Sequence, residues 1–81
     1  MLDTQGNINV KQIREILENY LGKNIKIKCN LGRNKTETYD VIIKSLYSYI
    51  FLTETNDENH IKKSFSYTDI ITKTIKIYID F

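Results

Sequence analysis

The sequence feature that most constrains the fold is a single change in hydrophobic period, which falls at Gly22. Before Gly22, apolar residues recur at helical spacing. After it, apolar and polar residues alternate, as Ile25, Ile27 and Cys29 do with Lys26, Lys28 and Asn30. A period near 3.6 is typical of an amphipathic helix, and a period of 2 is typical of a strand with one buried face. We therefore expect one helix followed by a sheet.

The helix is predicted over residues 8–22. Asn9 is a suitable N-cap, and Gln12 stands three residues later, where the partner residue of a capping box is found. Gly22 can adopt the left-handed conformation that commonly ends a helix. One apolar stripe runs along the predicted helix and consists of Val10, Ile13, Ile16, Leu17, Tyr20 and Leu21.

The remainder of the chain predicts short strands. The composition of fourteen Ile, two Val and no Ala favours them, because β-branched side chains suit a pleated surface. Gly32 and Asn34 tolerate the backbone of a tight reversal, so a loop is expected over 31–35. The five predicted strands cover residues 25–30, 36–46, 49–54, 61–65 and 75–79, with a turn at 56–59 and a 3₁₀ turn or helical cap at 66–69.

These elements predict a mostly β (α+β) fold: an N-terminal helix followed by a five-stranded antiparallel SH3-like or Sm-like small barrel. A chain of 81 residues is too short to build two cores, so residues 1–81 are expected to form a single domain. Within it we expect a flexible tail at 1–7, the helix at 8–22 and the barrel at 23–81. Closure of the sheet would remove exposed edges.

The positive charges are clustered, although the formal net charge is only +2. Residues 23–35 contain no Asp or Glu, yet they include Lys23, Lys26, Lys28, Arg33 and Lys35. If the first and last strands pair, Lys76 and Tyr78 lie beside Lys26 and Lys28. The functional interpretation is a surface that binds an anionic partner such as nucleic acid. The alternative is a set of lysines that only keeps an outward face soluble and its edges unpaired.

Six Tyr and three Phe raise the question of a base-stacking surface. Tyr47 and Tyr49 are the strongest candidates if they lie near Arg33 and Lys35. The alternative is that these aromatic residues pack in the core or in cross-strand pairs.

Residues that would support catalysis or metal binding are sparse. The single Cys29 shares a strand face with Ile25 and Ile27, which predicts a buried apolar role, and His60 has no second His or Cys pair to complete a metal site. We expect no catalytic residues, no metal and no cofactor, and hence no enzyme. The sequence also contains no apolar stretch of spanning length and no signal-like leader, so we expect a cytoplasmic location and no membrane partner.

Four segments resemble the Veg family of small proteins of Gram-positive bacteria. They are residues 21–23 (Leu-Gly-Lys), 32–36 (Gly-Arg-Asn-Lys-Thr), 47–51 and 64–70 (Ser-Phe-Ser-Tyr-Thr-Asp-Ile), and their order and spacing agree without gaps. The resemblance implies a helix-plus-barrel domain without catalytic activity. It also implies a stimulator of biofilm formation that influences a transcriptional repressor.

Two hypotheses follow. In the first, the chain is a non-enzymatic regulatory binding protein that contacts nucleic acid or a repressor protein through Lys23, Lys26, Lys28, Arg33, Lys35, Tyr47, Tyr49 and Lys76. In the second, it is a structural or protein-interaction module that forms a homo-oligomer through sheet edges or aromatic contacts.

Overall fold

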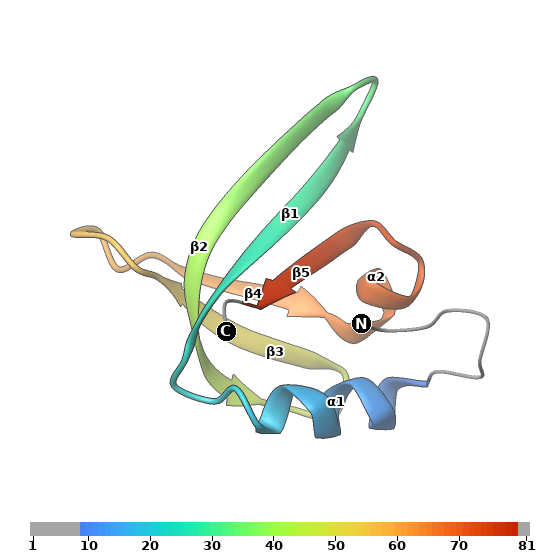
Figure 1. The fold of residues 1–81 in the computed structure, drawn as a ribbon, viewed down its shortest axis with the longest axis vertical. Helices are drawn as coiled ribbons and strands as arrows, with labels where there is room; N and C mark the ends of the chain where they lie inside the picture. The colour runs from blue at the N-terminus through green and yellow to red at the C-terminus, as the bar shows by residue number, and fades with distance from the viewer. Residues whose placement is uncertain (1–8, 80–81) are drawn as a thin grey trace.

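The computed structural model describes residues 9–79, which fold as a curved antiparallel sheet with two helices (Figure 1). The elements in chain order are α1 (Val10–Glu18), β1 (Asn24–Gly32), β2 (Lys35–Leu46), β3 (Ile50–Thr55), β4 (Lys62–Ser66), α2 (Tyr67–Ile71) and β5 (Ile75–Ile79). The β-rich class and the order of the elements agree with the prediction. The tail predicted at 1–7 lies outside the described residues.

Helix α1 begins where its cap predicts. The Oδ1 atom of Asn9 accepts a hydrogen bond from the backbone N–H of Gln12, and the Oε1 atom of Gln12 accepts one from the N–H of Asn9, both at 2.9 Å. This reciprocal pair satisfies two of the backbone donors that a helix start leaves unpaired. The capping box is therefore confirmed.

The end of α1 differs from the prediction. The α-helix stops at Glu18 with Asn19 as its C-cap, four residues before the predicted stop at 22. The chain then continues through tighter turns, in which the N–H of Tyr20 donates to the carbonyl of Leu17 at 2.9 Å and the N–H of Lys23 to that of Tyr20 at 2.9 Å. Such i→i−3 bonds commonly tighten the last turns of a helix. Gly22 has φ +78° but ends this turn segment and not the α-helix itself.

The sheet has the strand order β4-β3-β2-β1-β5. The predicted pairing of the first and last strands is confirmed, with Lys26 opposite Tyr78 and Lys28 opposite Lys76. The predicted closure into a barrel is not found in residues 9–79, because β4 and β5 lie at the two ends of this order. The chain between them forms α2, whose Tyr67 and Ile70 are buried, and this helix packs against both strands and α1. In a closed barrel, β4 and β5 would pair with each other. Here the helices cover the core at that place instead.

The core lies between the inner face of the sheet and the two helices (Figure 1). It contains the middle of the apolar stripe of α1, since Ile13 and Leu17 are buried. Its aromatic centre is Phe51, which packs against Phe65 and Tyr67 with ring centroids 5.7 and 5.5 Å apart. The buried hydrophobic residues are Ile13, Leu17, Ile25, Ile27, Val41, Ile43, Phe51, Tyr67, Ile70 and Ile75. Within residues 9–79, neither helix has the length and apolar character that crossing a membrane requires.

The loop predicted at 31–35 is shorter in the structure. Strands β1 and β2 are joined by a two-residue turn, Arg33 and Asn34, with φ of +45° and +63°. Positive φ at both central positions is the requirement of the type I′ turn that best fits the twist of a hairpin. The register jumps from Asn30 opposite Thr36 to Gly32 opposite Lys35, so Leu31 is the extra residue of a bulge just before the turn.

Candidate functional site

The outer face of β1 and β5 carries three lysines, which with Tyr78 we call the basic face: Lys26, Lys28 and Lys76. Lys28 stands directly opposite Lys76 in the ladder, and Lys26 stands opposite Tyr78, whose side chain is 49% exposed. Residues directly opposite each other on one face of an antiparallel pair have Cβ atoms about 4.5–5.5 Å apart, and like charges in that position destabilise the sheet. The β1–β5 pair therefore concentrates positive charge on the side away from the core.

Acidic residues on the same face lie toward the other half of the sheet. No Asp or Glu occurs in β1 or β5. Asp40 on β2 is opposite Lys26, and its carboxylate accepts a hydrogen bond from the side-chain amide of Asn24 at 2.5 Å. Further along, Glu54 of β3 pairs with Lys44 at 3.6 Å. The outer face thus changes from the facing cations Lys28 and Lys76 to balanced charges at β2 and β3, with Asp40 opposite Lys26 at the boundary.

Arg33 and Lys35 lie at the free end of the β1–β2 hairpin, which projects from the rest of the molecule (Figure 1). Both side chains are exposed. Five residue steps separate Lys28 from Arg33, which is roughly 16 Å along an extended strand. These two cations therefore extend the basic face along one direction and do not form a compact cluster with it.

Lys23 does not join the basic face. It precedes β1, and its Nζ lies 5.8 Å from the ring centroid of Tyr20, in a cation–π geometry. The nine residues of β1 separate it from Arg33 by roughly 25–30 Å. Lys23 and Arg33 were grouped because they are close in the sequence. In an extended strand, however, each residue adds about 3.3 Å of length, so residues ten apart lie far from each other.

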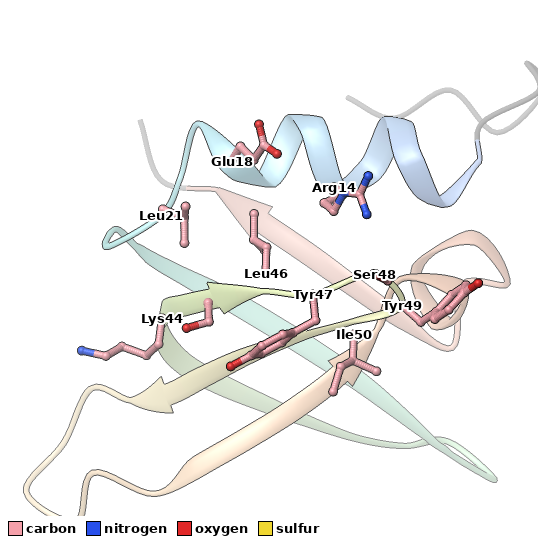
Figure 2. A pocket seen from close by; sticks show the side chains of 10 residues that line it. Arg14, Glu18, Leu21, Lys44, Leu46, Tyr47, Ser48, Tyr49 and Ile50 are labelled. Atoms are coloured by element: carbon pink, nitrogen blue, oxygen red, sulfur yellow. The ribbon is translucent and has the colours of Figure 1, made fainter.

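The structure does not bring Tyr47 and Tyr49 near Arg33 and Lys35, so the condition for a base-stacking surface there is not met. The two tyrosines follow the C-terminal end of β2, whereas Lys35 begins it, about 36 Å away along the strand. They line a shallow surface depression between α1 and the β2–β3 turn, shown in Figure 2, together with Arg14, Glu18, Leu21, Lys44, Ser45, Leu46, Ser48 and Ile50. The buried Tyr67 contacts this turn from the core side, and its hydroxyl donates to the carbonyl of Tyr47 at 2.8 Å.

Tyr78 is the aromatic residue that the structure does place beside the lysines. It forms one wall of a small hollow with Asn24, Ile25, Lys26 and Ile79. The alternation of Ile75, Ile77 and Ile79 with Lys76 and Tyr78 predicts its outward position. Sequence reasoning nevertheless chose Tyr47 and Tyr49, because a count of tyrosines near basic residues in the sequence ignores which strand end each one occupies.

The inner face of the hairpin carries a second polar group of residues below the free end. Cys29 lies on the face of Ile25 and Ile27, as predicted, but it is half-buried. Burial raises the pKa of the Cys29 thiol, and the nearby carboxylate of Glu37 raises it further. The hydroxyl of Tyr39 donates to Glu37, which raises the pKa of Tyr39, and Lys63 Nζ lies 4.2 Å from the Tyr39 ring centroid. Because its pKa is raised, the Cys29 thiol stays protonated at neutral pH, in keeping with a packing role.

In the turn after β3, the acidic side chain of Asp57 has a structural role, because it accepts hydrogen bonds from the turn itself. The Oδ1 atom of Asp57 accepts hydrogen bonds from the hydroxyl of Thr55 and from the N–H groups of Asn59 and His60, at 2.9–3.2 Å. These donors, with the Thr55 hydroxyl first, lower the pKa of Asp57. In the part of the chain that the structure describes, no three His, Cys, Asp or Glu side chains gather in a way that could hold a metal ion.

Fold and surface together define a small β-rich domain with a capped N-terminal helix, an open five-stranded sheet and a basic face on β1 and β5. A protein-family model described as biofilm formation stimulator VEG matches residues 8–78. The chain therefore belongs to the Veg family, as its sequence segments predict. Comparison with curated proteins gives no match.

Proposed function

We propose that this protein is a non-enzymatic regulatory protein that binds nucleic acid through the basic face and the hairpin end. Membership of the Veg family supports a role in biofilm formation. We infer that the protein serves that role in the cytoplasm, through transcriptional regulation. The observation that carries the proposal is the pair Lys28 and Lys76, two like charges directly opposite each other on the outer face of the sheet.

The physical argument starts from the cost of that pair. Two ammonium groups facing each other destabilise the ladder, and no carboxylate of β1 or β5 offsets them. A polyanion offsets this repulsion, and release of its condensed counterions adds a favourable free energy that depends on salt. The regular phosphates of a nucleic acid match a row of cations along two adjacent strands.

Each residue has a separate proposed role. Lys26, Lys28 and Lys76 act as point charges toward phosphates, whereas the planar guanidinium of Arg33 can form two parallel hydrogen bonds to one acceptor group. The exposed phenol of Tyr78 supplies a hydroxyl donor for a phosphate oxygen or a surface for a base. Lys23, Tyr47 and Tyr49 are not part of this proposed surface.

The strand order also bears on the fold assignment. Because β1 joins the last strand β5 and the chain order is otherwise preserved across the sheet, we retain an SH3-like or Sm-like relationship as a proposal. The free edges of β4 and β5 could pair with a second copy of the chain, which is the alternative of a homo-oligomer. Light scattering over a range of concentrations tests this alternative. Lys62 and Lys63 on β4 act against edge pairing, since charged side chains on an edge strand disfavour it.

The test is binding of fluorescently labelled single-stranded and duplex nucleic acids as a function of salt. The double variant Lys28→Glu/Lys76→Glu should weaken binding by more than about tenfold, since two phosphate contacts are replaced by repulsion. The matched control, Lys11→Glu/Lys62→Glu, changes the net charge equally at exposed positions off the basic face.

Three outcomes would overturn the proposal. Binding that does not depend on salt removes its electrostatic basis, and equal loss in the two double variants shows a response to net charge alone. Binding of polyglutamate in preference to nucleic acid would assign the basic face to an acidic protein partner such as a repressor.

A further inference from the structure

We propose that the free end of the β1–β2 hairpin enters the major groove of double-helical DNA, while the lysines behind it contact the phosphate backbones. This inference rests on the proposed nucleic-acid binding and specifies the form of nucleic acid, the groove and the residues that enter it. It follows from the exposure, the dimensions and the side chains of the hairpin end.

The hairpin end is exposed on both faces. Every residue from 30 to 38 is exposed, in contrast to the alternating burial of the same strands nearer the helix. The last pair between β1 and β5 is Cys29 with Ile75, and the N–H of Asn30 still donates to the carbonyl of Thr74 at 3.0 Å, so beyond Asn30 β1 is paired with β2 alone. A two-stranded ribbon without a covered face is marginally stable in water. A partner that covers it would add the contacts that the described residues do not provide.

The dimensions of the ribbon fit the major groove. From Asn30 to the turn at Arg33 are three residue steps, roughly 10 Å at the rise of an extended strand. The major groove of B-form DNA is about 8.5 Å deep and about 12 Å wide and admits a two-stranded ribbon, whereas the minor groove is only about 6 Å wide. The tip can therefore reach the base edges before the wider part of the sheet meets the backbones.

The side chains at the tip are those that read base edges. Arg33 and Asn34 form the turn, and Lys35 and Thr36 follow it. Arginine and lysine hydrogen-bond to the acceptors of guanine, and asparagine to adenine. Glu37 is the one acidic residue between 30 and 38, and its carboxylate already accepts the hydroxyl of Tyr39 at the base of the ribbon. The tip itself thus presents donors to the groove without an opposing negative charge.

The basic face lies at the right distance to continue the contact. Lys28 is roughly 16 Å behind Arg33 along β1, and Lys76 stands beside it on β5. When the tip reaches the floor of the groove, which is about 8.5 Å deep, the backbones of these two lysines lie roughly 7–8 Å outside its mouth, about the reach of a lysine side chain toward the bordering phosphates. One binding mode then uses both the hairpin end and the otherwise unfavourable Lys28–Lys76 pair.

The experiment compares duplex DNA, duplex RNA and single-stranded DNA of the same sequence, each about two helical turns long (~20 bp). Duplex RNA is the informative control, because its A-form major groove is deep and too narrow for side chains to read, while its phosphate charge is the same. The wild type should bind duplex DNA at least about tenfold more tightly than duplex RNA. Methyl green, a major-groove ligand, should compete, and the minor-groove ligand netropsin should not.

The variant Arg33→Asn/Lys35→Thr tests the tip. Asn tolerates the positive φ at position 33, and Thr suits a strand, so circular dichroism should show an unchanged fold. The preference for duplex DNA over duplex RNA should fall to about twofold or less. The control Lys11→Gln/Lys62→Gln removes two charges elsewhere and should keep the preference.

The outcomes separate this inference from the proposed function. Equal affinity of the wild type for both duplexes, tightest binding to the single strand, or a preference that survives the tip variant overturns the groove-binding mode. In each of those cases the loss of binding in Lys28→Glu/Lys76→Glu still supports a nucleic-acid surface. If the wild type binds none of the three nucleic acids, both proposals fail together.

Discussion

The two ends of the β1–β2 hairpin are built on the same ladder but from opposite kinds of residue. Near α1, the inner face carries Ile25, Ile27, Val41 and Ile43, all of which are fully buried. Beyond Cys29 and Tyr39, both strands are exposed on both faces up to the turn. Backbone pairing is therefore continuous, whereas burial ends halfway along. The residues near α1 stabilise the fold through burial. The residues near the turn contribute little to the core, so their identities can serve contacts with a partner.

The difference shows in what each end would lose by mutation. At the near end a side chain is surrounded by core atoms, so its truncation loses transfer free energy and leaves a cavity. At the far end a side chain is in water before and after truncation, so little free energy of unfolding depends on it. Mutations at matched positions of the same strand pair measure this contrast directly.

The largest effect is expected for Ile27→Ala. Ile27 is fully buried between Tyr39 on β2 and Ile77 on β5, and removal of a buried isoleucine side chain costs about 2–5 kcal/mol of the free energy of unfolding. Urea unfolding followed by circular dichroism measures the loss. Thr36→Ala, on the exposed part of β2, is the control and should stay within about 0.5 kcal/mol of the wild type. Equal losses in the two variants would contradict the division of the hairpin into a packed and a free end.

A smaller effect is expected for Tyr67→Phe, which tests how the core supports the other end of β2. Tyr67 is fully buried, and its hydroxyl donates to the carbonyl of Tyr47 in the β2–β3 turn. Loss of one such hydrogen bond costs about 1 kcal/mol, while the ring and its packing on Phe51 are retained. Thermal unfolding should show a lower Tm. An unchanged Tm would mean that the turn is held without this bond. Nucleic-acid binding should not change, since the turn lies far from the basic face.

The parts of this fold that sequence predicts best are those fixed by local chemistry. The Asn9–Gln12 capping box, the outward lysines of β1 and the alternation in β5 all follow from residue spacing alone. The early end of α1 at Glu18 does not, because Asn19 to Gly22 can form either a helical turn or the tighter turns observed. The bulges at Leu31 and Lys44 also depend on how two strands meet, and neither strand encodes that alone.

The candidate site was predicted in part for the same reason. Lys26, Lys28 and Lys76 come together because alternation fixes their face and the β1–β5 pairing fixes their neighbours. Tyr47 and Tyr49 were grouped with Arg33 and Lys35, but these two pairs of residues lie at opposite ends of β2, which a long strand holds far apart. The number of predicted strands does not show whether β4 and β5 pair to close the sheet. They stay unpaired because the chain between them forms α2.

The smallest effect on stability is expected for Arg33→Asn, at the far end of the comparison. Arg33 has φ +45° and an exposed side chain, so the position requires a residue that tolerates the left-handed region and makes no demand on packing. Asn meets that requirement, and the free energy of unfolding should stay within about 0.5 kcal/mol of the wild type. Arg33→Val is the informative counterpart, because a β-branched residue at positive φ should cost about 1–3 kcal/mol. If the Asn variant lost as much stability as Ile27→Ala, the hairpin end would have to be part of the folding core. If the Val variant lost none, the turn would have to adopt another backbone, and the hairpin end would not be the fixed ribbon that entry into a DNA groove requires.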